Sequence, residues 1–166
     1  MADVMKSPRA RAAVLLALDE DLGSVSNTAF ARRCDATSEA LVDPKAKAVG
    51  EIYARVPCVV AGATVAAAVL KAVDKAIKGT ILRPDGTQVK PNETILQFSG
   101  KARSILAAER TALNFMQRMC ATATLTRKFV DATKKWGTLI LDTRKTTPGL
   151  RVFEKYAVTC GGGTNH

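Results

Sequence analysis

The sequence predicts an α+β fold in which helices flank a group of short strands. Three observations predict it: a helix-forming start, short extended runs between residues 48 and 98, and an uninterrupted helical pattern from Ala102 to about Trp136. The chain has 166 residues, of which 47% are apolar, so it can bury a core without disulfides or a structural metal.

The first helix is predicted to begin at Ser7-Pro8, because serine suits the N-cap and proline suits the first helical position. Apolar residues then recur on one face as far as Leu22, and Gly23 should end the helix. Residues 24–44 are polar and show little periodicity, which indicates a long connection with room for a short strand.

The middle of the chain is predicted to hold short strands around one alanine-rich helix. These elements are strands at 48–55 and 58–61, a helix at 64–77 ended by Gly79, extended runs at 81–83 and 88–89 flanking a turn at 84–86, and a strand at 94–98.

The last third should be mostly helical. Residues 102–136 contain no proline or glycine and predict one long helix or two abutting helices. Thr138 to Leu141 reads as a short strand, and Leu150 to Tyr156 as a helix. Glycine is costly to order and usually stands where backbone approaches something closely, so Gly161-Gly162-Gly163 at the end of the sequence indicates either a disordered tail or a chain cut inside a functional segment.

The net charge of +10, from 25 Lys and Arg against 15 Asp and Glu, favours an anionic partner. Nucleic acid is the weaker candidate, because the basic residues are dispersed and only 5% of residues are aromatic. The longest uncharged run, residues 56–70, is too short to span a membrane and reads as a buried strand, turn and helix.

The four cysteines are widely spaced, and the single histidine, His166, has no neighbouring ligand, so neither a zinc site nor a disulfide framework is expected. We expect reduced, packed thiols. The N-terminus lacks a basic-then-apolar signal pattern, which predicts a cytoplasmic protein.

One candidate site is Thr143-Arg144-Lys145-Thr146-Thr147-Pro148-Gly149, directly after a predicted strand. At the C-terminal end of a barrel strand, Arg144 and Lys145 would bind carboxylates and phosphates. On spacing alone, a solvated basic loop explains the pattern as well or better.

A second candidate is the helical segment 109–114, where Arg110 and Asn114 should share a polar edge. A salt-bridged helix face is the simpler interpretation. His166 is the third candidate, although a terminal histidine is usually solvated. No phosphate-binding glycine motif of the P-loop or dinucleotide-binding type is present.

Five ordered segments resemble the carboxylating nicotinate-nucleotide pyrophosphorylase, or quinolinate phosphoribosyltransferase, family. These are Ala108–Phe115, Ala123-Thr124, Leu141–Arg151, Lys155–Val158 and Gly161–His166. Weaker similarity extends back to Glu20-Asp21-Leu22-Gly23, so the resemblance covers nearly the whole chain.

The resemblance implies that quinolinate and phosphoribosyl pyrophosphate react, with Mg²⁺, to give nicotinate mononucleotide, pyrophosphate and carbon dioxide in NAD biosynthesis. It implies an N-terminal open-faced α/β sandwich, residues 1–115, followed by the first elements of an incomplete α/β barrel, residues 116–166. It also implies a homodimer with shared sites.

Carried over by position, the resemblance assigns five substrate-binding residues. Arg144 and His166 would bind the quinolinate carboxylates, and Lys145 would meet phosphoribosyl pyrophosphate. Thr143 would line the same pocket, and Arg110 would reach into the partner subunit's site. No Mg²⁺ ligand is assigned within this chain.

The sequence departs from the family at two places. Val25-Ser26-Asn27-Thr28 stands where the family has Gly-Asp-x-Thr, and Cys120-Ala121 stands where it has Ser-Gly. Family members also continue beyond the histidine into an arginine, a lysine-bearing strand, acidic residues and phosphate loops. We therefore expect the chain to be an N-terminal portion that is inactive alone.

Two alternatives remain open at this stage. One is a paralogue of the same fold that is associated with molybdenum uptake. The other is a non-catalytic basic module for binding or oligomerisation, with the charge serving nucleic acid.

Overall fold

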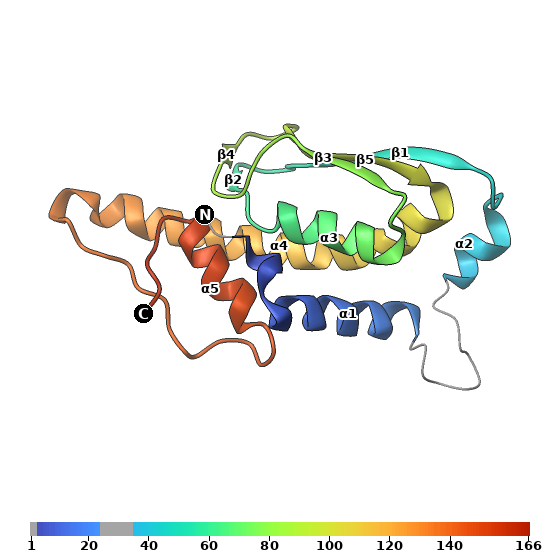
Figure 1. Cartoon of the computed structure of the whole chain (residues 1–166). Helices are drawn as coiled ribbons and strands as arrows, with labels where there is room; N and C mark the ends of the chain where they lie inside the picture. The colour runs from blue at the N-terminus through green and yellow to red at the C-terminus, as the bar shows by residue number, and fades with distance from the viewer. Residues whose placement is uncertain (1–2, 24–34) are drawn as a thin grey trace.

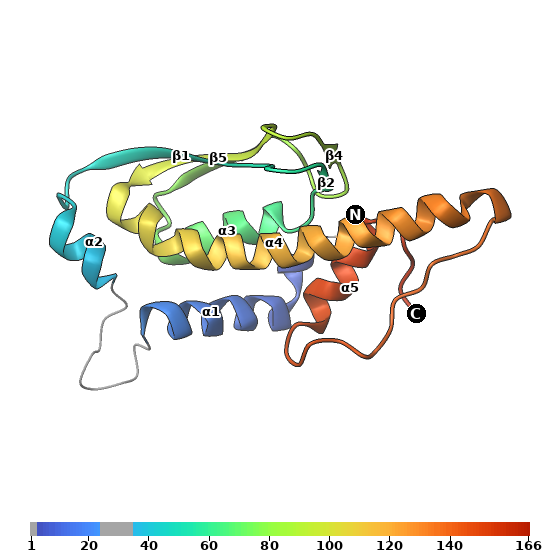
Figure 2. The ribbon, with the colours of Figure 1, turned by 180° about the vertical axis from the view of Figure 1, so that it is seen from behind.

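A computed structural model describes residues 3–23 and 35–166 (Figure 1). The α+β class is confirmed: an open sheet lies over helices, and these helices cover only one of its faces, as the two opposite views show (Figures 1 and 2). Among the described residues, no helix is long and apolar enough to cross a membrane.

The first helix, α1, spans Pro8–Leu22 and follows a short 3₁₀ helix, η1, at Val4–Lys6. Gly23 ends α1 with φ of 84°, a conformation that favours glycine. Ser7 occupies the N-cap position as expected, but its side chain makes no capping hydrogen bond. Pro8 at the first helical position is therefore the clearer start signal.

A second helix, α2 at Ala36–Leu41, replaces part of the predicted connection, so that prediction is wrong for this stretch. Asp35 caps it: its carboxylate accepts hydrogen bonds from Ser38 N at 3.2 Å and Ser38 Oγ at 2.6 Å. These bonds satisfy free donors at the helix start. Residues 24–34, which include the Val25–Thr28 departure, lie outside the described residues.

The main sheet is antiparallel in the order β1-β5-β3. Its strands are β1 at Lys47–Tyr53, β5 at Thr94–Lys101 and β3 at Lys78–Ile81. Exposure alternates along β1, where Val49 is 81% exposed, as in a sheet with one open face. The open-faced layer is thus present.

The middle of the chain differs from the prediction at two points. The turn at 84–86 and the extended run at 88–89 are present, and this run, β4 at Gln88–Val89, pairs with β2 at Cys58–Val59. Of the run predicted at 81–83, only Ile81 lies in a strand, where it pairs with Leu96 in the main sheet. The alanine-rich helix α3, Ala63–Val73, ends at Asp74 rather than Gly79, which lies in β3.

The expected long helix is confirmed as a single element, α4 at Ala102–Thr133, followed by the 3₁₀ turn η2 at Lys134–Trp136. The last helix, α5, spans Arg151–Cys160. The predicted strand at 138–141 is reduced to one parallel bridge between Leu141 and Thr164. No further strand of the described chain lies beside it.

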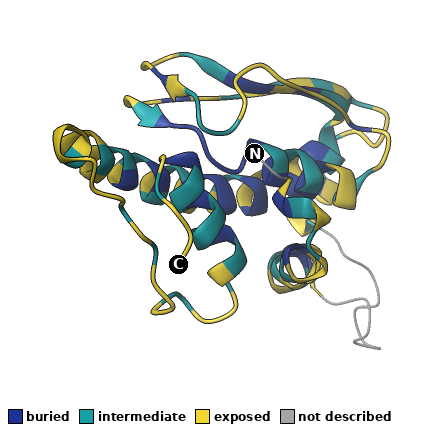
Figure 3. Ribbon diagram, turned by 60° about the vertical axis from the view of Figure 1, so that its left-hand side comes forward, coloured by how far each residue is buried: buried dark blue, intermediate teal, exposed yellow. Residues whose placement is uncertain are grey.

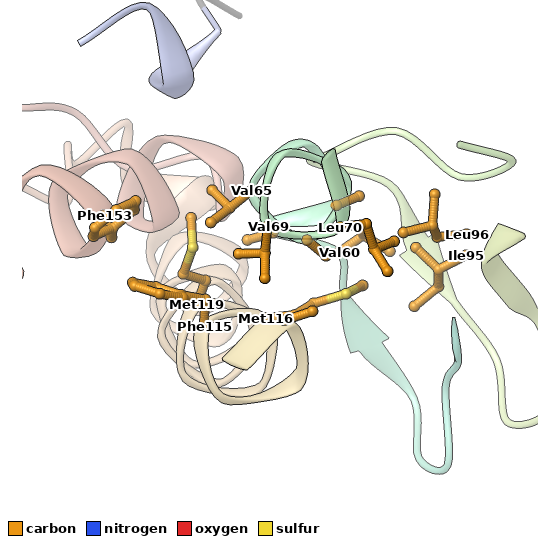
Figure 4. Close-up of a cluster of buried hydrophobic side chains, with 14 of the residues drawn as sticks. Val60, Val65, Val69, Leu70, Ile95, Leu96, Phe115, Met116, Met119 and Phe153 are labelled. Carbon is orange, nitrogen blue, oxygen red and sulfur yellow. The ribbon is translucent and has the colours of Figure 1, made fainter. Parts of the chain in front are cut away.

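The core lies between the sheet, α3 and α4, and extends to α5 through Phe153 (Figure 4). The rings of Phe115 and Phe153 are 4.8 Å apart and join α4 to α5. The outer end of α4 and residues 134–149, which lead to α5, are mostly exposed (Figure 3). Cys58, Cys120 and Cys160 are free thiols, half-buried or buried.

Candidate functional site

The loop after α4 meets the end of the chain at Asp142, whose side chain is only 3% exposed. One carboxylate oxygen accepts hydrogen bonds from Lys155 Nζ at 2.5 Å and from the backbone N–H of His166 at 2.9 Å. The side-chain amide of Asn165, oriented to satisfy its hydrogen bonds, donates to the other oxygen at 2.6 Å. Asp142 therefore joins three parts of the chain.

Backbone hydrogen bonds also join these two segments, in parallel register. Asp142 N donates to Thr164 O at 3.0 Å, and Thr164 N donates to Ile140 O at 2.8 Å. The predicted site segments at 143–145 and 164–166 are thereby held side by side, although about twenty residues separate them in sequence.

The glycine run allows this close approach. A β-carbon at Gly161 would collide with the Ala123 carbonyl and Thr126, and one at Gly163 would lie 2.7 Å from Val158. Gly162 adopts φ of 91°. These glycines therefore pack closely against the rest of the chain, and the disordered tail that the sequence allowed is wrong for this segment.

The first turns of α5 hold the 143–147 loop. Arg151 donates to Thr146 Oγ1 at 3.0 Å and to the Arg144 carbonyl at 3.2 Å, and the Glu154 carboxylate accepts Thr147 N at 3.3 Å. Arg118, on α4, donates to Thr147 Oγ1 at 3.2 Å. The backbone of this loop is thus fixed from two helices.

The predicted ligand-binding side chains remain available on this fixed backbone. Arg144, Lys145 and His166 are exposed, and their side chains make no hydrogen bond or ion pair with any other residue that the structure describes. Thr143 Oγ1 accepts Lys145 N at 3.1 Å and so shapes the turn between them. Four of the five predicted residues therefore lie in one cluster.

Electrostatics keep the Asp142 carboxylate ionised. Burial alone would raise its pKa, but the hydrogen bonds from Lys155 and the His166 backbone outweigh burial and lower the pKa. An ionised Asp142 then supplies a fixed negative charge that offsets Lys155, while Arg144 and Lys145 have no ion-pair partner among the described residues.

Arg110, the fifth predicted residue, lies apart from this cluster. Its Nη1 is 2.7 Å from Asp21 Oδ1 at the end of α1, and its side chain is 74% exposed. The hydrogen bond with Asp21 raises the pKa of Arg110. Both the salt-bridged interpretation and the shared polar edge hold, since Arg110 and Asn114 line one hollow of about 420 Å³ beside α2.

A second cleft, of about 330 Å³, opens between α1, α4 and α5 beside the held loop. Phe115 and Phe153 form its apolar wall, while Asp21, Arg118 and Glu154 contribute polar groups. Sequence reasoning missed the roles of Asp142, Lys155, Arg118 and Glu154. The first two stand inside segments that matched the family pattern, which was the available signal.

The residues present do not fit a Mg²⁺ site of their own. No three His, Cys, Asp or Glu side chains group to hold a metal within residues 3–23 and 35–166. Mg²⁺ prefers octahedral oxygen ligands. Asp142, the carboxylate nearest the cluster, already accepts bonds from Lys155, His166 and Asn165.

Comparisons with known proteins place this geometry in context. A profile described as quinolinate phosphoribosyl transferase, N-terminal domain, matches residues 35–120, and the profile of the C-terminal domain matches residues 122–166. The chain is 40% identical over 156 residues to the chloroplastic carboxylating nicotinate-nucleotide pyrophosphorylase of Oryza sativa subsp. japonica, covering 94% of this chain. It is 40% identical over 116 residues, 70% of this chain, to a probable enzyme of the same name from Bacillus subtilis.

A solved structure supports the same family assignment. The nicotinate-nucleotide pyrophosphorylase from Francisella tularensis aligns over 100% of this chain with a TM-score of 0.85 and 36% identity. The chain spans 57% of that structure, 39% of the rice relative and 40% of the Bacillus relative. It therefore corresponds to roughly half or less of each relative's length.

Proposed function

The chain belongs to the quinolinate phosphoribosyltransferase family, and from that premise we propose that its protein transfers a phosphoribosyl group to quinolinate with loss of carbon dioxide. The products are nicotinate mononucleotide, pyrophosphate and carbon dioxide, within NAD biosynthesis. Both substrates are anionic, which agrees with the net charge of +10.

The single observation that carries this proposal is the junction at Asp142. It places the exposed cations Arg144 and Lys145 beside His166 on a backbone that α4 and α5 hold rigidly. A fixed group of donors suits a planar dicarboxylate, because preorganised hydrogen bonds need no rearrangement on binding.

Each side chain has a proposed role. Arg144 offers a fork to one quinolinate carboxylate, and His166 contacts the carboxylates from the neighbouring segment. Lys145, a point charge, meets the phosphates of phosphoribosyl pyrophosphate, and Thr143 lines the pocket. The same cations stabilise the negative charge that develops on the pyridine ring when carbon dioxide leaves.

We further propose a homodimer in which Arg110 reaches the partner subunit's site. The 74% exposure of the Arg110 side chain supports this, because its guanidinium stands at the surface despite its bond to Asp21. Residues 1–115 and 116–166 are proposed as the sandwich and the start of the barrel, with the continuous helix α4 joining them.

We propose that Mg²⁺ takes part as the counter-ion of the pyrophosphate, whose negative charge it would offset. It is not proposed as an ion that residues of this chain hold. A cytoplasmic location is also proposed. The name of the rice relative places that protein in the chloroplast, so localisation of a tagged protein in its own cell is the direct test.

A binding and turnover assay on the 166-residue chain tests the proposed function. We expect the chain to bind quinolinate. With quinolinate, phosphoribosyl pyrophosphate and Mg²⁺ present, we expect it to form no nicotinate mononucleotide. Folded chain that fails to bind quinolinate contradicts the proposed substrate site, and robust turnover by homogeneous chain contradicts the expected inactivity. Salt-sensitive binding to random DNA, without competition from quinolinate, would favour a nucleic-acid module.

A further inference from the structure

We propose that Asp142 is a positioning residue, which sets His166 and the 143–145 loop at the correct mutual distance without touching substrate. This inference rests on the proposed function. Asp142 is 3% exposed, and both carboxylate oxygens already accept hydrogen bonds from the protein. A group so enclosed acts through the residues it holds.

The position of Asp142 in the chain makes it suited to this role. Arg144 and Lys145 follow it by two and three residues, so their backbone leaves directly from the point that Asp142 fixes. On the other segment, the hydrogen bond from His166 N reaches across 24 residues to the same carboxylate. One side chain therefore governs the spacing between the two halves of the cluster.

A carboxylate serves here better than its amide. Asp142 accepts bonds from an ammonium, a backbone N–H and an amide N–H, so all its partners are donors. In Asp142→Asn, one of the two oxygen acceptors becomes an NH₂ donor that faces another N–H donor. The substitution would also leave the Lys155 ammonium, whose side chain is 23% exposed, without its charge partner.

Lys155 completes the arrangement from α5. It faces Asp142 from the helix whose neighbouring residues Arg151 and Glu154 hold the loop backbone. The ion pair between Lys155 and Asp142 therefore couples α5, the loop and the terminal segment in one rigid unit. Removal of either charge should loosen the spacing, while replacement of lysine by arginine should keep the charge.

The single histidine of the chain gives a direct test. Labelling with [¹⁵N]histidine yields one backbone amide resonance, that of His166, which reports its bond to Asp142. We expect a dispersed, rigid resonance in the wild type and a mobile, coil-like one in Asp142→Asn and Lys155→Met. Lys155→Arg should restore it, and Asp131→Asn, at an exposed carboxylate on α4, serves as the matched control.

Quinolinate affinity is then measured on the same samples by calorimetry, with circular dichroism to confirm folding. We expect Asp142→Asn to weaken binding about 10- to 100-fold, the loss expected when a charge-assisted hydrogen bond to the ligand is misaligned. Asp131→Asn should stay within about twofold, as expected for a surface residue outside the site.

The outcomes separate the two proposals. An unchanged His166 amide in Asp142→Asn, or unchanged quinolinate affinity beside an altered amide, overturns the positioning role. If the wild type fails to bind quinolinate while its His166 amide depends on Asp142, the proposed substrate is wrong and the positioning of His166 stands.

Discussion

Arg110 Nη1 lies 2.7 Å from Asp21 Oδ1, and this ion pair joins α4 to the end of α1 across 89 residues of sequence. Asp35, the cap of α2, receives a further attraction from the same arginine, which helps to lower the pKa of Asp35 after its bonds to Ser38. Arg110 thus stands between the ends of two helices, held by its own chain at the surface.

This arrangement predicts a functional rather than a structural role for Arg110. Because the Arg110 side chain is 74% exposed and its ion pair with the half-buried Asp21 lies at the surface, Arg110→Ala should leave the circular dichroism spectrum and thermal midpoint nearly unchanged. In the proposed homodimer, Arg110→Ala should weaken quinolinate binding at least about tenfold, and Arg110→Lys should not restore it, since lysine lacks the guanidinium fork. A large loss of thermal stability in Arg110→Ala would instead assign the residue to the fold.

The docking of α1 depends on Leu18, which is fully buried where this helix packs against α3 and α4. Leu18→Ala should reduce the free energy of unfolding by about 2–5 kcal/mol, because it removes buried methyl groups and leaves a cavity. Leu16, on the same helix and 70% exposed, is the matched control, and its alanine variant should change by less than about 0.5 kcal/mol. Urea unfolding measures both, and equal losses would contradict this packing.

The buried thiols should resist chemical modification. Burial raises the pKa of Cys120 and of Cys160 to about 12, so only about 1 in 10,000 of either is thiolate at pH 8. Burial also raises the pKa of Cys58, which is half-exposed. In native protein, iodoacetamide should label Cys58 well before the other two, as peptide mass spectrometry can measure. Equal labelling rates in the folded state would contradict the packing.

By the resemblance noted in the sequence, Cys120 stands at a position where the family has serine. Its Sγ accepts a hydrogen bond from Ala61 N and donates one to Ala61 O, both at 3.3 Å. A hydroxyl can make the same two bonds, so we expect Cys120→Ser to fold normally. The departure from the family pattern is therefore a local exchange between α4 and the segment after β2.

Acid should release the junction at Asp142. Its folded pKa lies below the ordinary value of 3.8, so the unfolded chain takes up the proton first as pH falls. The stabilisation is therefore complete well above pH 3.8 and disappears as the pH falls through the folded pKa. Wild type should exceed Asp142→Asn by about 1–3 kcal/mol in unfolding free energy at pH 7 and pH 5, with the difference shrinking at pH 3. A constant difference down to pH 3 would contradict this linkage.

Local signals predicted the long elements of the fold well. Pro8 and Gly23 mark the ends of α1, and the run without proline or glycine after residue 102 marks α4. Strand pairing could not be predicted in the same way, because it depends on tertiary contacts. Gln88–Val89 pairs with β2 and Ile81 pairs with Leu96, and neither partner is adjacent in sequence.

The candidate site was predicted in part, for a similar reason. Arg144 and Lys145 stand together in one motif, so their pattern is visible in the sequence. The role of Asp142 arises only when Lys155 and His166, 13 and 24 residues away, fold onto its carboxylate. Contacts between segments this far apart in sequence follow no regular spacing, so hydrophobic periodicity cannot predict them.

Quinolinate binding by Arg144 variants tests the central claim most directly. Titration calorimetry of the 166-residue chain should show one saturable site, weakened about 10- to 100-fold in Arg144→Ala because a charge-assisted, forked contact is lost. Arg144→Lys should recover little of it. Lys128→Ala, at an exposed cation on α4, should stay within about twofold. Equal affinity in wild type and Arg144→Ala, or an equal loss in Lys128→Ala, would contradict a built site for the dicarboxylate.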